Sequence, residues 1–484
     1  MDYFIGIDIG TTATKAVAFD DGGGIIAHHS VSYDMQHPQD GWAEQSPDVI
    51  WHAVTDSLNI VQALCFAKGA LQGVSFSAAM HSLIAVDADG TPLTNCIIWA
   101  DNRAASIAEG LRISDFDLFR RTGTPIHAMS PLVKILWLRQ NLPDVFRRTA
   151  KFVGIKEYIF FKIFGKWLAD VSLASATGLM NLEKMHWDEA ALDLANIRTD
   201  QLSDIRPPQY FERFSLKKTA KHTETTLNLP DQTPFVLGAS DGCLANLGSD
   251  ATQTGDVALT VGTSGAIRAF VPDVFIDEKM RTFCYRLDAK RCVIGGGTNS
   301  GAFVLQWFKE EIVRSRLSFG DFYATAAEAA AGSDGLLMLP YLMGERAPIW
   351  DSSARGAFVG ISAEHRREHF IRAAMEGVIF HLFSIGKILN EHQPTARILA
   401  GGGFAQSPLW VQIVADVFQK PVVVGATVET SARGAVIIGR EALGLPPFPP
   451  LSMEHVFEPN PLNAAIYGAQ SDRFSRLYEA LRSV

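Results

Sequence analysis

One pattern occurs twice in this chain and limits its possible folds more than any other feature. Residues 5–20, IGIDIGTTATKAVAFD, and residues 255–271, GDVALTVGTSGAIRAFV, each place a glycine-rich turn between two apolar runs. Apolar runs separated by such a turn are typical of a β-hairpin. The two turns lie about 250 residues apart, so we predict one structural plan that the chain uses twice.

The elements after each hairpin support this prediction. In the first half, residues 25–30 complete a meander, a helix is predicted from Pro47 with Ser46 as its N-cap, and LQGVSFSAAM follows as a strand. In the second half, CVIGGG supplies a third strand, a helical pattern resumes at Phe303 and covers EHFIRAAMEGVIFHLFSIGKIL, and RILAGGG resembles a strand.

We therefore predict an α/β chain of two domains, residues 1–245 and 246–484, with a ligand cleft between them. The length of 484 residues would by itself be compatible with three domains as well as with two large ones.

Composition excludes some functions. A net charge of -9 and a pI near 5.8 argue against general binding of nucleic acid, which requires a basic face. The five cysteines are widely spaced without a CxxC motif, so neither a disulfide framework nor a zinc site is predicted. With no signal peptide or membrane-spanning apolar run visible, we expect a soluble, cytoplasmic protein without nucleic-acid or membrane partners.

The two turns are candidate phosphate-binding loops. Glycine lets backbone N–H groups approach an anion closely, and neighbouring hydroxyls add donors, so two facing turns would hold a polyphosphate from both sides. For either turn alone, a plain hairpin turn is the simpler interpretation. The candidate residues are Gly10, Thr11 and Thr12 in the first turn, and Gly262, Thr263 and Ser264 in the second.

Two aspartates end apolar strands. Asp8 precedes the first turn, where it would bind the magnesium that accompanies nucleotide phosphates, although it could equally cap its own turn. Asp241, in FVLGASDGCLANLG, would act as a general base if it faces the cleft, accepting the proton of a hydroxyl that attacks phosphorus. Taken by itself, the SDG sequence favours a type I turn.

The run LAGGGFAQSPLWVQIVADV joins a predicted strand to a predicted helix through three glycines. Gly401, Gly402 and Gly403 would let a flat base lie on the backbone at the helix entrance, with Gln406 or Ser407 as polar contacts. A tightly packed structural turn is the competing interpretation.

Three stretches of the first half, GWAEQ, AMHS and WADNR, mix aromatic, sulfur or imidazole groups with hydrogen-bonding groups, as a polyol pocket requires. A lone histidine is more often structural than catalytic, so this prediction depends on the clustering. The candidate substrate residues are Trp42, Glu44, Met80, His81, Asp101 and Arg103.

These residues, in this order, resemble the FGGY carbohydrate kinases, a family with the actin, Hsp70 and hexokinase ATPase fold. The resemblance covers essentially the whole chain. Beyond the two turns, it includes GWAEQSP, GERAPIWD, and two stretches similar to the family signatures, MSPLVKILWLRQN and GAFVGISAEHRREHFIRAAME. It implies two actin-like ATPase (ribonuclease H-like) domains, each a mixed β-sheet flanked by helices.

The resemblance also implies roles. The family transfers the γ-phosphate of ATP, with Mg²⁺, to a sugar or polyol hydroxyl, and an aspartate in the position of Asp241 is its base. Gly402, Gly403 and Ser407 would touch adenosine, and Gln306 would lie near the nucleotide phosphates.

For the substrate, SFSAAMHSLIAVD together with CIIWADNRA looks most like the gluconate kinases of this family, whereas xylulose kinases usually have Gln-Met-His-Gly around His81. A carboxylate in a closing pocket needs a cation, and Arg103 and Lys156 are the candidates. A xylulose or other pentulose or polyol kinase is the alternative. The non-enzymatic alternative is an ATP-gated chaperone-like or regulatory protein of the same superfamily. The sequence is compatible with a homodimer but does not indicate one.

Overall fold

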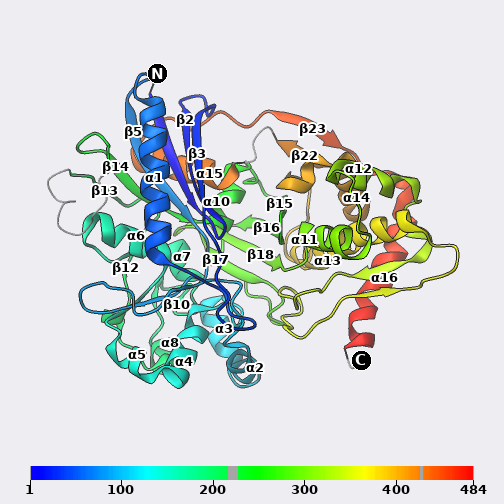
Figure 1. The fold of residues 1–484 in the computed structure, drawn as a ribbon, viewed down its shortest axis with the longest axis horizontal. Coiled ribbons are helices and arrows are strands. Elements are labelled where there is room, and N and C mark those ends of the chain that lie inside the picture. The colour runs from blue at the N-terminus through cyan, green and yellow to red at the C-terminus, as the bar shows by residue number, and fades with distance from the viewer. Residues whose placement is uncertain (1, 216–226, 426–428, 483–484) are drawn as a thin grey trace.

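The computed structural model describes residues 2–215, 227–425 and 429–482, and two large β-sheets lie side by side in it (Figure 1). The first sheet has the strand order β13-β14-β5-β1-β2-β3, and the second has the order β17-β18-β16-β15-β21-β22-β23. All strands of the first sheet precede residue 241, and all strands of the second follow residue 255. The division of the strands into two halves agrees with the prediction.

The two sheets share one topology. In each, an antiparallel meander (β1-β2-β3 or β15-β16-β18) is extended beside its first strand by two parallel strands, β5 and β14 or β21 and β22. The predicted repetition of one plan is therefore confirmed. The strands are β1 (Tyr3–Ile9), β2 (Ala13–Asp20), β3 (Ile25–Ser32), β5 (Leu71–Ala78), β13 (Phe211–Arg213), β14 (Pro234–Ser240), β15 (Asp256–Val261), β16 (Gly265–Val271), β17 (Phe283–Arg286), β18 (Cys292–Thr298), β21 (Arg397–Gly401), β22 (Val422–Gly425) and β23 (Met453–Phe457).

Helix α1 (Pro47–Cys65) covers one face of the first sheet and begins as the sequence predicts. The Ser46 side chain accepts a hydrogen bond from the Val49 N–H, and Pro47 occupies the first turn. The side chains of Ile50 and Val54 pack in the same core as alternate residues of β1. Alternate strand residues point to opposite faces, so the remaining residues of β1 must meet a second layer.

That second layer consists of α10 (Asp241–Gly248) and α15 (Thr430–Ala442), and α15 comes from the far end of the chain. Figure 1 shows α15, in orange, among the blue and green elements of the first sheet. A Cβ on Gly6 of β1 would lie 2.4 Å from the Ala432 carbonyl oxygen, and one on Gly434 would lie 2.1 Å from that of Leu244. The glycines allow backbones to touch here. Residue 245 falls inside α10, and the exact boundary stays a prediction.

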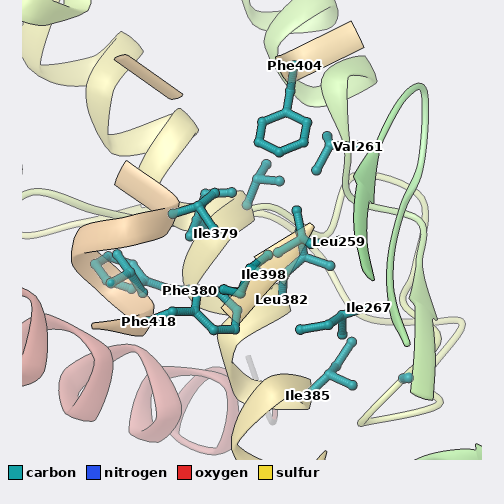
Figure 2. Close-up of a cluster of buried hydrophobic side chains, with 14 of the residues drawn as sticks. Leu259, Val261, Ile267, Ile379, Phe380, Leu382, Ile385, Ile398, Phe404 and Phe418 are labelled. Carbon is teal, nitrogen blue, oxygen red and sulfur yellow. The ribbon is translucent and has the colours of Figure 1, made fainter. Parts of the chain in front are cut away.

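Helix α13 (Arg367–His392) covers one face of the second sheet. Figure 2 shows its Ile379, Leu382 and Ile385 packed against Leu259 and Ile267 of the strands. Because these side chains are almost fully buried, the cluster fixes the helix on this face and leaves the opposite face of the sheet turned toward α10.

Shorter elements complete both halves. No helix in the described ranges is long and apolar enough to cross a membrane. The other helices are α2 (Ala105–Ser114), α3 (Phe116–Thr122), α4 (Pro131–Asn141), α5 (Pro143–Arg148), α6 (Ile155–Phe164), α7 (Val171–Ser175), α8 (Glu189–Ala195), α11 (Ala302–Trp307), α12 (Phe319–Thr325), α14 (Pro408–Phe418) and α16 (Ala464–Leu481). The other strands are β4 (Glu44–Gln45), β6 (Ile84–Val86), β7 (Cys96–Ile97), β8 (Lys151–Val153), β9 (Leu168–Asp170), β10 (Met180–Asn181), β11 (His186–Trp187), β12 (Asp204–Arg206), β19 (Leu337–Leu339) and β20 (Ala357–Val359).

The contact between α10 and α15 predicts a strong effect of one methyl group. Gly434→Ala should lower the free energy of unfolding by about 1–3 kcal/mol, because the new Cβ forces the two helices apart. Gly468→Ala in α16 is the matched control, since Gly468 is exposed and its Cβ would meet nothing within 4 Å. It should stabilise the protein by about 0.5–1 kcal/mol through helix propensity. Urea unfolding gives the free energy of unfolding of both variants. Equal changes in the two variants would contradict the close packing of α10 against α15.

Candidate active site

Both predicted phosphate turns border one cavity of about 210 Å³. Thr11 of the first turn and Ser264 of the second line it, so the structure brings together two turns that are far apart in the sequence. The other lining residues also come from both halves of the chain: Met80, His81, Trp99, Met129, Asp241, Thr260, Gly265, Ala266, Arg268, Phe283, Tyr285, Gly297, Arg346 and Trp350.

The carbonyl oxygens of the turns are held by donors from neighbouring elements. The Gln45 amide donates to the Thr11 oxygen at 2.6 Å, and the Tyr33 hydroxyl donates to the Gly10 oxygen at 2.6 Å. In the second turn, the Gly262 oxygen accepts from the first N–H of α11, that of Ala302, at 2.7 Å. Carbonyl oxygens repel an anion, so occupying them elsewhere suits a phosphate site. Thr12, Gly262 and Thr263 are exposed.

Asp241 opens α10 directly after β14, with Ser240 as the N-cap. The type I turn favoured by SDG alone is therefore wrong, because the segment starts a helix. The carboxylate accepts a hydrogen bond from the Gly242 N–H at 2.7 Å. Burial raises the pKa of Asp241, while the Arg268 charge and the N–H groups of Gly242 and Met80 oppose that rise. A carboxylate with a raised pKa at the edge of a cavity is suited to accept a proton.

Asp8 lies near the end of β1, where its carboxylate accepts a hydrogen bond from the Ser77 hydroxyl at 2.7 Å. Burial raises the pKa of Asp8 to about 6, and the nearby charge of Asp241 adds to the rise. A bound cation would offset the free-energy cost of keeping this carboxylate ionised. Within the described ranges, no three His, Cys, Asp or Glu side chains form a metal-binding cluster. One carboxylate nevertheless fits a Mg²⁺ that keeps water and phosphate oxygens as its other ligands.

A second cavity, of about 550 Å³, brings together Gln306, Gly403 and Ser407, three of the predicted nucleotide residues. The Ser407 hydroxyl also caps α14 by accepting a hydrogen bond from the Trp410 N–H. Gly402 does not border the cavity. It has φ +90°, and a Cβ there would lie 2.6 Å from the Val261 oxygen. The structural interpretation of the glycine run therefore holds for Gly402, while Gly403 opens onto a space of a size that suits a nucleoside.

His81 lines the first cavity and is held rigidly. Its ring Nδ1 donates to the Ala176 carbonyl oxygen at 2.8 Å, and burial lowers its pKa to about 3. The ring is therefore neutral at physiological pH, with Nε2 free to accept a hydrogen bond. The Lys134 ammonium, which sequence reasoning missed, donates to the carbonyl oxygens of His81, Ile97 and Ile98 at 2.6, 3.1 and 2.8 Å. It ties the His81 loop to the segment before Trp99.

The four predicted substrate residues Trp42, Glu44, Asp101 and Arg103 form a separate cluster. The Arg103 guanidinium pairs with both carboxylates, at 2.8 Å from Asp101, and lies 3.7 Å over the Trp42 ring. None of the four borders the first cavity. The cluster connects two segments of the first half, residues 42–44 and 101–103, which is a structural task, and its role in substrate binding stays a prediction.

Lys156, the other predicted partner for a substrate carboxylate, is also occupied. Its ammonium pairs with Asp170 at 2.7 Å, and both side chains are almost completely buried. It does not border the cavity. Both cations proposed from the sequence are therefore already neutralised, and this placement counts against their predicted role.

The cations that do border the cavity are Arg268 and Arg346 from the second half. Arg346 donates to the Asn299 side chain at 2.9 Å and to the Thr298 oxygen at 2.8 Å, and lies 4.6 Å over the Trp99 ring. Burial lowers its pKa to about 10. Two features of the sequence could have pointed to these arginines. Arg346 lies in the family-like stretch GERAPIWD, and Arg268 interrupts the apolar strand after the second turn.

Comparison with known sequences gives one consistent family. The profile of the N-terminal domain of the FGGY family of carbohydrate kinases matches residues 3–248, and that of the C-terminal domain matches residues 257–443. The gluconokinase of Bacillus subtilis is 43% identical, covering 91% of this chain and 88% of its own length. A xylulose kinase of Lactococcus lactis is 30% identical, covering 100% and 96%.

Solved structures give the same fold. A gluconate kinase from Lactobacillus acidophilus has a TM-score of 0.94 at 36% identity, covering 99% of this chain and 98% of its own. A ligand-bound xylulose kinase from the same organism also has a TM-score of 0.94 at 36% identity, covering 100% and 99%. The fold class predicted from the sequence is confirmed.

The burial of Arg103 predicts a loss of stability when it is replaced. Arg103→Met should lower the free energy of unfolding by about 3–5 kcal/mol, because Asp101 would remain buried without its partner. Arg120→Met is the matched control. It breaks an Arg–Asp pair with Asp117 in which both side chains are more than half exposed, and should cost less than about 1 kcal/mol.

Urea unfolding compares the two variants. At a temperature where Arg103→Met is folded, we expect its KM for the phosphate acceptor to be unchanged. A raised KM in a fully folded variant would restore Arg103 as a substrate residue.

Proposed function

This chain belongs to the FGGY family of carbohydrate kinases, and we propose that it transfers the γ-phosphate of ATP to the 6-hydroxyl of D-gluconate. The observation that carries the substrate is the identity of 43% with a gluconokinase, against 30% with a xylulose kinase. The two Lactobacillus structures do not separate these substrates. Arg268 and Arg346 at the cavity supply the positive charge that a sugar acid requires.

Asp241 is the proposed base. As the acceptor oxygen bonds to the γ-phosphorus, its proton moves to the Asp241 carboxylate, and the bond from phosphorus to the bridging oxygen breaks to release ADP. Proton acceptance of this kind contributes about 10²- to 10⁴-fold, and positioning with charge neutralisation provides most of the rest. His81, fixed by Lys134 and Ala176, is placed to accept a hydrogen bond from an acceptor hydroxyl.

ATP would lie across the two cavities. The adenosine would occupy the space at Gln306, Gly403 and Ser407, and the phosphates would reach the turns at Thr11 and Ser264. Helix α11 joins these regions, because its first N–H binds the second turn and its Gln306 side chain borders the nucleoside cavity.

Magnesium would be held by Asp8, with water and phosphate oxygens completing its coordination. It would supply positive charge to the phosphate oxygens. Asp8 itself keeps a half-buried carboxylate beside the first turn, oriented by Ser77.

A xylulose or other pentulose or polyol kinase remains the alternative enzyme. The chaperone-like alternative is less well supported, because an ATPase that activates water needs no pocket with His81, Trp99 and Tyr285 beside its base. All five cysteines are buried free thiols, which suits the proposed cytoplasmic location. A homodimer stays a prediction.

The base assignment predicts the behaviour of Asp241→Asn. With gluconate and ATP, kcat should fall by about 10²- to 10⁴-fold with little change in either KM, because the amide keeps the shape but cannot accept the proton. ADP release would be measured with gluconate, D-xylulose, glycerol and no acceptor. Full activity of the variant would refute the assignment of Asp241 as the base. ATP hydrolysis that is independent of every acceptor would refute the assignment as a kinase. Turnover of a neutral sugar without turnover of gluconate would refute gluconate as the substrate.

The same assay has a pH dependence. Burial raises the pKa of Asp241 above its ordinary value of 3.8, and the base works only when ionised. In the wild type, kcat/KM should therefore fall as the pH decreases, with a midpoint above 3.8. The contribution of Asp241 should be absent from the residual activity of Asp241→Asn, which should keep only the fall caused by protonation of Asp8, whose pKa burial raises to about 6.

The nucleoside cavity predicts a selective effect at Gly403. A Cβ there meets nothing within 4 Å, so Gly403→Val should fold normally while its side chain enters the cavity. We expect the KM for ATP to rise by about tenfold or more, which corresponds to about 1.4 kcal/mol of lost binding, with the KM for gluconate unchanged. Gly468→Val, at an exposed and open position, is the control. An unchanged KM for ATP would show that adenosine binds elsewhere.

A further inference from the structure

Three polar side-chain atoms of residues that line the first cavity have no hydrogen-bond partner among the residues that the structure describes. One is Nε1 of Trp350, and the other two belong to strands of the second sheet. These two are Nε of Arg268 and the hydroxyl oxygen of Tyr285, and both are buried. The contact of the Arg268 guanidinium with Thr260 is long, with Nη1 at 3.5 Å from the hydroxyl. A buried donor without a partner costs about 1–3 kcal/mol, and more when it is charged. The burial of these two atoms without partners in the protein therefore needs an explanation.

The strand register places both side chains on one face of the second sheet. Gly295 of β18 is opposite Arg268 of β16 on one side and opposite Phe283 of β17 on the other. Tyr285 lies two residues beyond Phe283 and therefore points to the same face. This face borders the cavity, since all three side chains line it. Gly295 contributes no side chain between them, and a Cβ there would lie only 3.2 Å from Cγ of Arg268.

The Tyr285 hydroxyl lies on the acceptor side of the cavity, and Arg268 lies beside the base, since a Cβ on Gly242 would be 3.1 Å from Nε of Arg268. The Tyr285 ring stacks on Phe283 at 4.3 Å and meets the His81 ring edge-on at 5.8 Å. Arg346 lies over Trp99 in the same region. His81 and Trp99 are the groups that the proposed function gives to the acceptor, whereas Thr11 and Ser264 mark the phosphate side.

The two guanidiniums that line the cavity are not in close ion pairs. Within the described ranges, its lining contains two guanidiniums, those of Arg268 and Arg346, and one carboxylate, that of Asp241. His81 is neutral because burial lowers its pKa to about 3. Neither guanidinium forms an ion pair with a described carboxylate within 4.0 Å. The opposite charges that act most strongly on them are Asp241 for Arg268 and Glu345 for Arg346, and a ligand anion in direct contact would offset more of the cost of removing these cations from water.

We propose that Arg268, together with the Tyr285 hydroxyl and Arg346, binds the carboxylate of the acceptor, and that Arg268 sets the preference for a sugar acid over a neutral polyol. This inference rests on the proposed function, and it identifies the residues that recognise the acid group. A guanidinium suits the task because it offers a planar pair of donors to the two carboxylate oxygens. Arg346 already donates hydrogen bonds to Thr298 and Asn299. Of the two arginines, Arg268 is therefore the one whose donors remain available.

The test compares two ligands that differ only at this group. D-glucitol is D-gluconate with the carboxylate replaced by a hydroxymethyl group. Calorimetry with ADP present would give the Kd of both ligands for the wild type and for Arg268→Gln. We expect gluconate to bind about 100-fold more weakly to the variant, as for the loss of a charged hydrogen-bonded pair, and D-glucitol to change less than about threefold on the same reasoning. Arg268→Lys should recover part of the loss.

The controls separate recognition from folding. Arg316→Gln removes an exposed guanidinium of the same half and should change neither Kd. If Arg268→Gln does not fold, Tyr285→Phe tests the same subsite by removing one oxygen, and should also weaken gluconate binding more than D-glucitol binding.

Three results would overturn the inference. Equal weakening of both ligands would give Arg268 a structural role. An unchanged Kd for gluconate with a reduced kcat for every acceptor would assign Arg268 to the transferred phosphoryl group. Wild-type enzyme that phosphorylates a neutral sugar but neither binds nor phosphorylates gluconate would refute the proposed function itself. That last result comes from the wild type alone, so the two failures are distinguishable.

Discussion

The close contact between α10 and α15 is the constraint on which the site depends. The helices touch through backbone, since a Cβ on Gly248 of α10 would lie 1.8 Å from the Thr430 oxygen of α15. Asp241 is the first residue of α10, and α15 is the helix that returns from the second sheet to the first. The position of the base relative to the second sheet is therefore set by how closely these two helices approach, and glycine is the residue that allows that approach.

The sequence revealed those parts of the fold that have a local cause. Alternation of apolar residues and glycine-rich turns predicted both hairpins, and the Ser46-Pro47 pair predicted the start of α1, because each signal acts within a few residues. The helix at Asp241 was missed for the opposite reason. It has 8 residues with a glycine in its first turn and another at its end, so its own propensity is poor, and packing against α15 and the first sheet maintains it.

The arginine and lysine side chains show the same limit of sequence-based prediction more clearly. Arg103 and Lys156 are visible in the sequence as charges, but their partners are not, because Glu44 lies 59 residues from Arg103 and Asp170 becomes a neighbour of Lys156 only in the folded chain. Arg268 interrupts an apolar strand and Arg346 lies in a family-like stretch, but both were overlooked because neither signal states whether the charge faces a cavity or solvent. Only the tertiary structure decides which charge is already paired.

The repeated plan also explains why the site is asymmetric. Asp8 stands two residues before the first turn, and the equivalent position before the second turn is Thr260. Both carboxylates proposed for the chemistry, Asp8 and Asp241, come from the first half, whereas both guanidiniums come from the second. A ligand that carries negative charge therefore interacts favourably with the second half while its reacting hydroxyl must reach the base of the first. An anionic acceptor joins the two halves electrostatically, which a neutral sugar in the same cavity would not do to the same extent.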